Sequence, residues 1–442
     1  MRQFCPLLTL VFLVSASAAM YAEDWPQFRG PDGQGQAGGT GWPLRWSEQE
    51  NVVWKVLLPG RGWSSPVVSG DQIWLTTALE TSATPDVSKQ VLEHKGKDVP
   101  SPQVASHLTL KAICVDRKSG RVVQDLTLLE VDEPVVICSA NSFASPTPVV
   151  DDGRVYCEFG AMGTVCLDAA TGQVAWSRKL VVDHQVGPGS SLVVHGSLLI
   201  LVRDGIDQQY VTAVDKATGE TVWKTERPPL SGTPPTLRKA FSTPLVFRVE
   251  GREQMVVTGA RWIVSYEPAT GKELWRVDTG GTFSNASRPA YGCGLVFAGT
   301  SYGGSVLRAI SPDGRGDVTG THVRWQTLRA VPKQASPLLV GDELYLVSDS
   351  GIASCQDARS GVVHWSERLP GTYSASPVSA DGRVYCFGED GATTVLRAGR
   401  QFERLAENRL EGRVLASPAL VHQAILIRTA THLYCVGPTA RP

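Results

Sequence analysis

The string most suggestive of chemistry is Gly299-Thr300-Ser301-Tyr302-Gly303, which matches the pattern G-x-S-x-G. In α/β-hydrolases this pattern holds a serine nucleophile on a sharp turn between a strand and a helix. Here the string falls where one short strand is expected to turn into another. We therefore interpret it as a glycine-rich hairpin and predict no nucleophile at Ser301.

Metal and acid–base chemistry have little support in the sequence. Asp151-Asp152-Gly153 and Asp381-Gly382 are interpreted as hairpin turns, because such turns select aspartate and glycine. The chain contains no H-E-x-x-H, Walker or C-x-x-C motif. Its eight histidines are scattered, and only His184 is expected at a binding surface. We predict no catalytic residue and no metal site, which favours a protein that is not an enzyme.

A structural motif recurs where a catalytic one is lacking. Residues Ala213, Asp215, Thr218, Gly219 and Trp223 follow the pattern A-x-D-x-x-T-G-x-x-x-W. Variants of this pattern begin at Cys114, Cys166, Ser265 and Cys355. A motif that recurs every ~40–50 residues indicates stacked or radial repeats of one supersecondary unit.

Each repeat is expected to form four short antiparallel strands. The aspartate opens a turn by accepting hydrogen bonds from backbone N–H groups, and the glycine supplies a positive φ. The tryptophan lies on the fourth strand, where it can pack on the neighbouring repeat and donate its indole N–H to a polar partner. The repeats must therefore pack on one another to bury both faces of each sheet.

A second marker counts the repeats. Most first strands are preceded by a small polar residue and proline, because proline at a strand start costs no interior ladder bond. The markers are Ser65, Ser145, Thr243, Arg288, Ser336, Ser376 and Ser417, each before proline, and Ser191 in a repeat without proline. They predict an eight-bladed β-propeller; seven blades is the alternative if the Ser191 repeat is misjudged.

The strand order is displaced at the two ends of the chain. A fourth strand at residues 51–58 precedes any first strand, and the chain ends with a third strand at Tyr434-Cys435-Val436. We expect the two ends to complete one blade together, so that the N-terminal strand closes the ring and hides the sheet edges. The predicted fold is all-β, an eight-bladed β-propeller of four-stranded antiparallel blades.

The propeller is expected to span residues 51–442. Residues 23–50 form a non-repetitive lead-in that we expect to pack across one face of the disc. Blade one holds an insertion at about residues 79–108, rich in charge, serine and proline, which we expect to be a long loop or flap. Residues 1–22, with Arg2 before an apolar run and small residues, are typical of a signal peptide. We expect an exported protein, periplasmic or secreted.

Composition restricts the partners. The 442-residue chain has a formal net charge of −1, which does not favour general binding to nucleic acid. No apolar run after residue 22 is long enough to cross a membrane, and we expect a monomer.

Most cysteines are interpreted as small buried apolar residues. Cys157 and Cys166 form an open case, because they could face each other across one hairpin and form a disulfide.

The repeat unit resembles that of pyrroloquinoline-quinone (PQQ)-like propellers. That superfamily includes quinoprotein alcohol dehydrogenases and the propeller lipoprotein of the outer-membrane β-barrel assembly machine. Nearly all of residues 23–442 resembles a bacterial family of exported PQQ-like repeat proteins. The resembling strings are Trp25-Pro26-Gln27-Phe28-Arg29-Gly30-Pro31, Gly62-Trp63-Ser64-Ser65-Pro66, Asn141-Ser142-Phe143-Ala144-Ser145-Pro146-Thr147-Pro148 and Leu344-Tyr345-Leu346-Val347-Ser348-Asp349-Ser350-Gly351. The resemblance implies the fold but no particular function, because one propeller fold hosts many functions.

The resemblance also raises the question of a cofactor. In the quinone-dependent dehydrogenases, a disulfide between adjacent cysteines stacks on one face of PQQ and a tryptophan on the other, and Ca²⁺ bridges the quinone to protein ligands. This chain has no two adjacent cysteines and no C-x-x-C-H haem motif. We therefore expect neither PQQ nor Ca²⁺, and a PQQ-dependent oxidoreductase is the alternative function.

Propellers bind ligands at a central funnel, lined by the loops that enter each innermost strand. Repeat alignment assigns to it Arg61, Trp63, Asn141, Phe143, His184, Arg238, Lys239, Phe241, Asn285, Lys333, Gln334, Tyr373 and Arg413. This set contains aromatic and cationic residues but no Asp or Glu, which predicts a positive mouth. We expect a non-catalytic binding or scaffold protein that engages a protein or an anionic or sugar-like ligand there. The alternative is that the aromatics wedge between blades and the cations are solvated.

Overall fold

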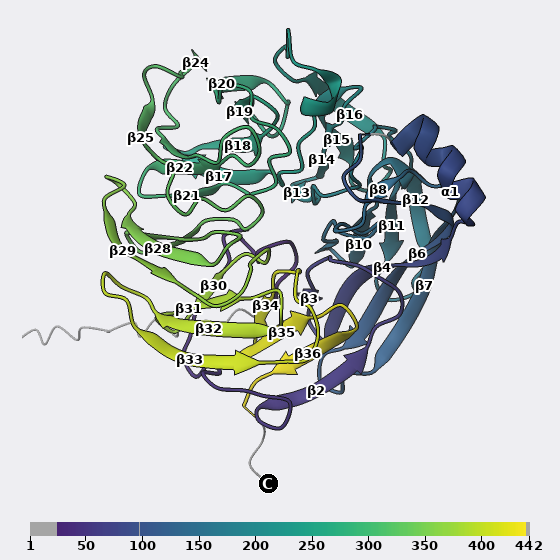
Figure 1. Ribbon diagram of the computed structural model, residues 1–442, viewed down its shortest axis with the longest axis horizontal. Coiled ribbons are helices and arrows are strands. Elements are labelled where there is room, and N and C mark those ends of the chain that lie inside the picture. Colours follow the sequence, from purple (N-terminus) through teal and green to yellow (C-terminus); the bar gives the residue numbers. More distant parts are fainter. Residues whose placement is uncertain (1–23, 97, 439–442) are drawn as a thin grey trace, which may run out of the picture.

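The repeated motif organises the chain into eight antiparallel sheets around a central axis (Figure 1). This computed structural model describes residues 24–96 and 98–438. The predicted all-β, eight-bladed propeller is confirmed. The signal peptide expected at residues 1–22 lies outside the described residues.

The first four blades follow one another along the chain. Blade one contains β3 (Val67–Ser69), β4 (Gln72–Ser82), β6 (Ala105–Asp116) and β7 (Val122–Asp132). Blade two contains β9 (Val149–Asp151), β10 (Arg154–Glu158), β11 (Thr164–Asp168) and β12 (Val174–Arg178). Blade three contains β13 (Val193–His195), β14 (Leu198–Asp204), β15 (Gln209–Asp215) and β16 (Thr221–Glu226). Blade four contains β17 (Leu245–Val249), β18 (Arg252–Thr258), β19 (Trp262–Tyr266) and β20 (Glu273–Asp278), with β24 (Gly316–Asp317) added in parallel.

The remaining blades complete the ring. Blade five contains β21 (Ala290–Gly292), β22 (Leu295–Gly299), β23 (Leu307–Ile310) and β25 (Val323–Thr327). Blade six contains β26 (Leu338–Val340), β27 (Glu343–Val347), β28 (Ile352–Asp357) and β29 (Val363–Arg368). Blade seven contains β30 (Val378–Ala380), β31 (Arg383–Phe387), β32 (Ala392–Arg397) and β33 (Arg404–Arg409), with β1 (Gln36–Ala37) added in parallel. Blade eight contains β34 (Ala419–Val421), β35 (Ala424–Arg428), β36 (His432–Val436) and β2 (Val52–Leu57).

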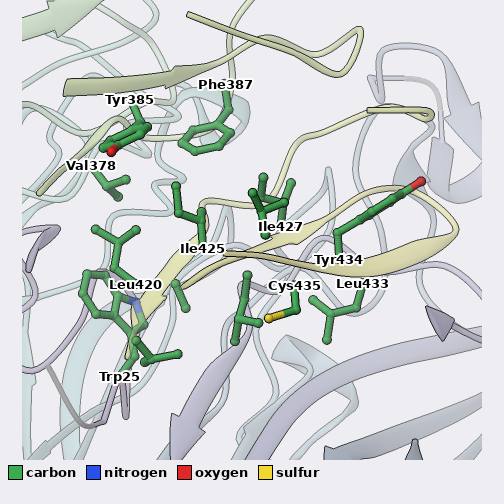
Figure 2. Packing of buried hydrophobic residues seen from close by; sticks show 14 of the residues in the cluster. Trp25, Val378, Tyr385, Phe387, Leu420, Ile425, Ile427, Leu433, Tyr434 and Cys435 are labelled. Atoms are coloured by element: carbon green, nitrogen blue, oxygen red, sulfur yellow. The ribbon is translucent and has the colours of Figure 1, made fainter. Parts of the chain in front are cut away.

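Blade eight combines strands from both ends of the described chain. β2 pairs antiparallel with β36, with Trp54 opposite Cys435. Alternate residues of β2 are half-buried, and Val52, Trp54 and Val56 pack on the largest apolar core. Figure 2 shows part of this core, where Trp25 of the lead-in lies beside Leu420 of β34.

The turn motif links neighbouring blades. In blade two, the Asp168 carboxylate accepts the backbone N–H of Thr171 at 2.8 Å. On the fourth strand, Trp176 donates its indole N–H to the carbonyl of Lys216 in blade three at 3.1 Å. A Cβ on Gly219 would lie 2.8 Å from the Trp176 ring, so the motif needs glycine where the preceding tryptophan packs.

The hydrogen bond from the fourth strand to the next blade is preserved by Gln124 but is missing at Trp275 and Trp223. Gln124, in place of tryptophan, donates its side-chain N–H to the carbonyl of Ala169 in the next blade at 3.0 Å. Trp275 donates instead to Gln254 of its own blade at 2.9 Å. Trp223 is half-buried, and its indole N–H has no partner in the described part of the chain. The predicted polar partner is therefore absent for Trp223, where the prediction is wrong.

A series of hydroxyl groups connects the first strands. It explains why a serine or threonine precedes the proline in most of the markers. Ser336 donates its backbone N–H to the hydroxyl of Ser376 in the next blade at 2.9 Å. In blade two the equivalent hydroxyl belongs to Thr147, which accepts the N–H of Ser65 at 3.0 Å. The prediction that Ser145 marks this strand is wrong, because two residue–proline pairs stand in tandem and the second directly precedes β9.

The first part of the lead-in lies against the first strands, and its later part runs outward along blade seven, where Trp46 donates its backbone N–H to Asn408 of β33 at 2.9 Å. Trp25 forms two backbone hydrogen bonds with Val68 of blade one, at 2.9 and 2.8 Å. Arg29 is buried and donates to the carbonyls of Pro377 at 3.0 Å and Pro337 at 3.1 Å. Because these partners belong to blades on different sides of the ring, the segment ties the inner strands together.

Arg288 accounts for the one marker that is neither serine nor threonine. Its side chain is buried and donates to the carbonyl of Pro244 at 3.0 Å and to the carbonyl of Phe28 in the lead-in. Burial lowers the pKa of Arg288 to about 10. Burial and the nearby charge of Arg288 lower the pKa of Arg29 to about 9. The two arginines are thus structural groups that connect the lead-in with the first strands.

The insertion of blade one is more regular than the predicted loop. β4 and β6 remain paired as far as Ser82 and Ala105, so the two ends of residues 79–108 are strand. Between them lie α1 (Pro85–Val91), the π-helical turn η1 (Leu92–Gly96) and β5 (Pro102–Gln103). β5 pairs with β8 (Ile137–Cys138) in the connection to blade two. Because the ends of β4 and β6 near the insertion are partly exposed, their polar residues resemble a loop in the sequence.

The open question of a disulfide is answered by the register of β10 and β11. Cys157 lies opposite Val165, whereas Cys166 lies opposite Tyr156. Successive side chains of a strand point to opposite faces, so the two cysteines lie on different faces of the blade. Both are free and buried, and burial raises the pKa of each thiol.

Candidate functional site

A cavity of about 750 Å³ lies at the face where successive blades are connected. Its walls come from the connections before β3, β9, β13, β17, β21, β26 and β34. The insertion of blade one and the turn between β22 and β23 complete it. Loops from most of the ring therefore converge where the repeat alignment places the funnel.

Several of the predicted funnel residues line this cavity. They are Trp63, Asn141, Lys239, Phe241 and Gln334. Asn141 also donates its side-chain amide to the carbonyls of Val186 and Pro188, each at 3.0 Å. Because those carbonyls belong to the next connection, Asn141 holds two neighbouring walls of the cavity together.

Other predicted funnel residues are buried below the surface, so the prediction that they face a ligand is wrong. Phe143 is fully buried in the core between blades one and two. Tyr373 is buried in the core of blades six and seven. Asn285 is fully buried and donates to the carbonyl of Gly259 at 2.8 Å. At these positions the aromatic side chains pack between blades, which is the alternative considered from sequence.

His184 is also buried, directly behind the cavity wall. Its ring packs against Phe241, with centroids 6.2 Å apart. Burial, together with the charge of Arg203, lowers the pKa of His184 to about 3. The imidazole is therefore neutral at physiological pH and too weak a base for proton transfer there. Beneath it lies a buried ion pair in which Arg203 and Glu158 are 3.1 Å apart.

The predicted cations are partly engaged by the protein itself. Arg413 forms an ion pair with Glu389 at 2.7 Å, and Arg238 donates to the carbonyl of Thr233 at 2.9 Å. Arg61 donates to Gln103 of the insertion and to backbone carbonyls of the following connection. Only the charge of Arg413 is paired with a carboxylate, whereas neutral acceptors hold Arg238 and Arg61 in place.

Lys333 is placed over an aromatic ring. Its ammonium nitrogen lies 5.0 Å from the centre of the Tyr302 ring. Tyr302 in turn packs against Phe283, with ring centroids 5.9 Å apart. Both rings line the cavity, so aromatic surface and positive charge adjoin at this side of the funnel.

Sequence reasoning missed the contribution of the insertion and of two polar residues. Asp98 and Pro100 of the insertion line the cavity, so the expected absence of acidic residues is wrong. Gln185 lines it next to the buried His184, and its amide N–H donates to the carbonyl of Asp98 at 3.2 Å. Tyr302 also lines the cavity and belongs to the G-x-S-x-G string. An aromatic residue on an expected turn was the feature of the sequence that could have indicated its role.

The serine of that string forms hydrogen bonds with neighbouring connections. Ser301 is buried, and its hydroxyl donates to the carbonyl of Lys333 at 2.5 Å. Its backbone N–H donates to the Asn285 side chain at 2.7 Å. The string joins β22 to β23, a turn between two strands rather than between a strand and a helix. Ser301 therefore holds neighbouring connections in place.

The residues of the cavity do not fit a quinone cofactor held as in the dehydrogenases. Cys138 lines the cavity, and its neighbours in the sequence are Ile137 and Ser139. The cavity therefore has no adjacent cysteine pair that could stack on the quinone ring. Within residues 24–96 and 98–438, no three His, Cys, Asp or Glu side chains cluster in a way that could hold a metal ion. The helices described in the same ranges are too short or too polar to cross a membrane.

A comparison with protein families identifies the family of this chain. The family described as outer membrane protein assembly factor BamB matches residues 45–225 and 207–437. The chain belongs to this family of PQQ-like propellers. The resemblance inferred from the repeats is thereby confirmed. A search of curated protein sequences finds no match.

Solved structures share the architecture at low identity. BamB from Moraxella catarrhalis is 12% identical, with a TM-score of 0.57 over 87% of this chain and 99% of that one. Quinohemoprotein alcohol dehydrogenase from Comamonas testosteroni is 13% identical, with a TM-score of 0.62 over 96% and 82%. A europium-containing methanol dehydrogenase is 11% identical, with a TM-score of 0.63 over 93% and 90%. At such identities the similarity establishes only the fold that this PQQ-like propeller has in common with them.

Proposed function

We propose that this PQQ-like propeller is an exported, non-catalytic binding protein whose funnel cavity receives a short segment of a partner protein. The observation that carries the proposal is the cavity of about 750 Å³, in which aromatic walls surround a few polar groups. Binding sites typically have this size and composition. Trp63, Phe241, Phe283 and Tyr302 supply the aromatic surface.

Two observations favour a protein segment as the occupant. The family is described as an outer membrane protein assembly factor, which supports a protein partner for this member. A cavity of about 750 Å³ has no room for a folded domain, so a partner can insert only a few side chains of an extended stretch.

Export follows from the signal-like residues 1–22 and would place the protein in the periplasm or outside the cell.

Site-specific photo-crosslinking in the exporting cell tests this function. Tyr302 lines the cavity and is 46% exposed, and Val123 on the outermost strand of blade one is 54% exposed. With p-benzoylphenylalanine at either position, we expect position 302 to capture one defined protein, with the crosslinks confined to a short linear segment. Position 123 serves as the matched control. Capture of the same protein at position 123 but not at 302 would contradict a funnel site.

A further inference from the structure

Lys239 is a buried cation in the wall of the cavity. The residue is only 6% exposed, yet it lines the cavity. Its ammonium group donates to the side-chain oxygen of Gln185 at 2.5 Å and to the carbonyl of Thr236. Both partners are neutral, and no carboxylate of the described residues lies within ion-pair distance of Lys239. An ammonium group has three N–H donors, so one is left without a partner from these two acceptors.

Two other buried cations are paired with carboxylates, whereas the buried Arg29, Arg288 and Arg428 donate to neutral acceptors and, unlike Lys239, do not line the cavity. Arg203 pairs with Glu158 at 3.1 Å, and Arg227 pairs with Asp204 at 2.7 Å. Burial of a charge is unfavourable unless an opposite charge and hydrogen bonds compensate for it. For Lys239 that compensation is incomplete within the chain. Burial lowers its pKa, and the more distant carboxylates of Asp183 and Asp98 oppose this only in part.

The surroundings of Lys239 are apolar and aromatic. Its ammonium nitrogen lies 5.7 Å from the centre of the Phe283 ring, and Phe241 lines the same cavity. The Tyr302 ring follows Phe283 at 5.9 Å. An apolar segment with one anionic group would match both these rings and the ammonium group.

We propose that Lys239 is the anion-recognising subsite of the funnel, and that the partner segment carries a glutamate or aspartate side chain flanked by apolar residues. The inference rests on the proposed function and names the chemistry of the segment. The carboxylate would accept the free N–H of the ammonium group while the neighbouring side chains contact Phe241 and Phe283. A single charge within aromatic walls suits a carboxylate better than a phosphate, which carries more charge and needs more donors.

Matched peptides test the subsite. The first probe is a hexapeptide blocked at both ends that alternates phenylalanine and valine around one glutamate. The second has glutamine in place of glutamate, and the third is the glutamine peptide with a free terminal carboxylate. Calorimetric titration of the full chain should show the glutamate peptide binding at least about tenfold more tightly than the blocked glutamine peptide, the scale of one charge-assisted hydrogen bond.

Variants assign that difference to Lys239. We expect Lys239→Gln to remove the tenfold preference and Lys239→Arg to retain most of it. Lys179→Gln, at an exposed position after β12, should leave it unchanged. An unchanged melting temperature establishes that each variant is folded.

The possible failures are distinguishable. Equal binding of the glutamate and blocked glutamine peptides would overturn the anion subsite and leave the funnel function standing. Tight binding of only the free-acid peptide would show that a chain terminus is recognised, which contradicts an internal acidic side chain. If no peptide binds the wild-type protein, both the subsite and the proposed insertion of a segment are wrong.

Discussion

Replacing the six residues of β2, Val52–Leu57, with a glycine–serine linker of equal length is expected to abolish cooperative folding. The linker cannot cover β36, so one blade would expose an unpaired edge and the apolar core beneath it. A domain is stable by only about 5–15 kcal/mol, and loss of a whole strand removes several buried side chains at once. Circular dichroism on heating should show no sharp transition, and size exclusion should show aggregates.

A matched control keeps the strand and changes only its outer face. Val53 and Leu57 are 45% and 65% exposed, and their replacement by serine should change the free energy of unfolding by less than about 1 kcal/mol. A linker variant that melts at the wild-type temperature would mean that β2 does not stabilise the ring.

Arg203→Ala is expected to lower the free energy of unfolding by about 3–5 kcal/mol, because it leaves a buried carboxylate without its counter-charge. The side chains of Arg203 and Glu158 are each 2% exposed, and Glu158 also accepts the backbone N–H of Gly160 at 2.7 Å. The pair joins blade three to blade two directly behind the funnel. Urea denaturation followed by tryptophan fluorescence measures the loss.

Two further variants distinguish the cost of leaving the buried Glu158 carboxylate unpaired from the cost of breaking an ion pair in general. The double variant Arg203→Met with Glu158→Gln should recover part of the loss, since no buried charge remains unpaired. Arg404→Ala breaks an ion pair whose side chains are 48% and 53% exposed, and should cost less than about 1 kcal/mol. A cost for Arg203→Ala as small as that of Arg404→Ala would contradict the structural role of the buried pair.

The blade count and the turn chemistry were predictable because each repeat needs the same few backbone contacts. Asp168 must accept the N–H of Thr171, and Gly219 must leave room for Trp176. Such requirements recur in five of the repeats and therefore appear in the sequence as a period. Thr147 was missed because two residue–proline pairs in tandem satisfy the same local pattern, and only the hydrogen bond across blades selects the second.

The site was less predictable because the repeat locates loops but not the direction of their side chains. Phe143 was matched to Phe241 through the wrong marker; with Thr147 as the marker, the equivalent position is Ser145. Ser145 and Phe241 line the cavity, whereas Phe143 is buried between blades. The insertion reaches the funnel through Asp98, which no repeat alignment can reveal. The same holds for the lead-in, where Arg29 hydrogen-bonds to carbonyls more than 300 residues away in sequence.

The most direct test of the funnel as a binding site is the affinity of the protein captured through position 302 for charge-reversed propellers. Lys239→Glu combined with Lys333→Glu should weaken binding about a hundredfold near physiological salt, and added salt should weaken wild-type binding as well. The same reversals at the exposed Lys179 and Lys272 should change affinity less than about twofold. Deletion of the insertion is not a suitable control, because Asp98 belongs to the cavity wall. Unchanged affinity of the Lys239 and Lys333 double variant would contradict binding at the funnel.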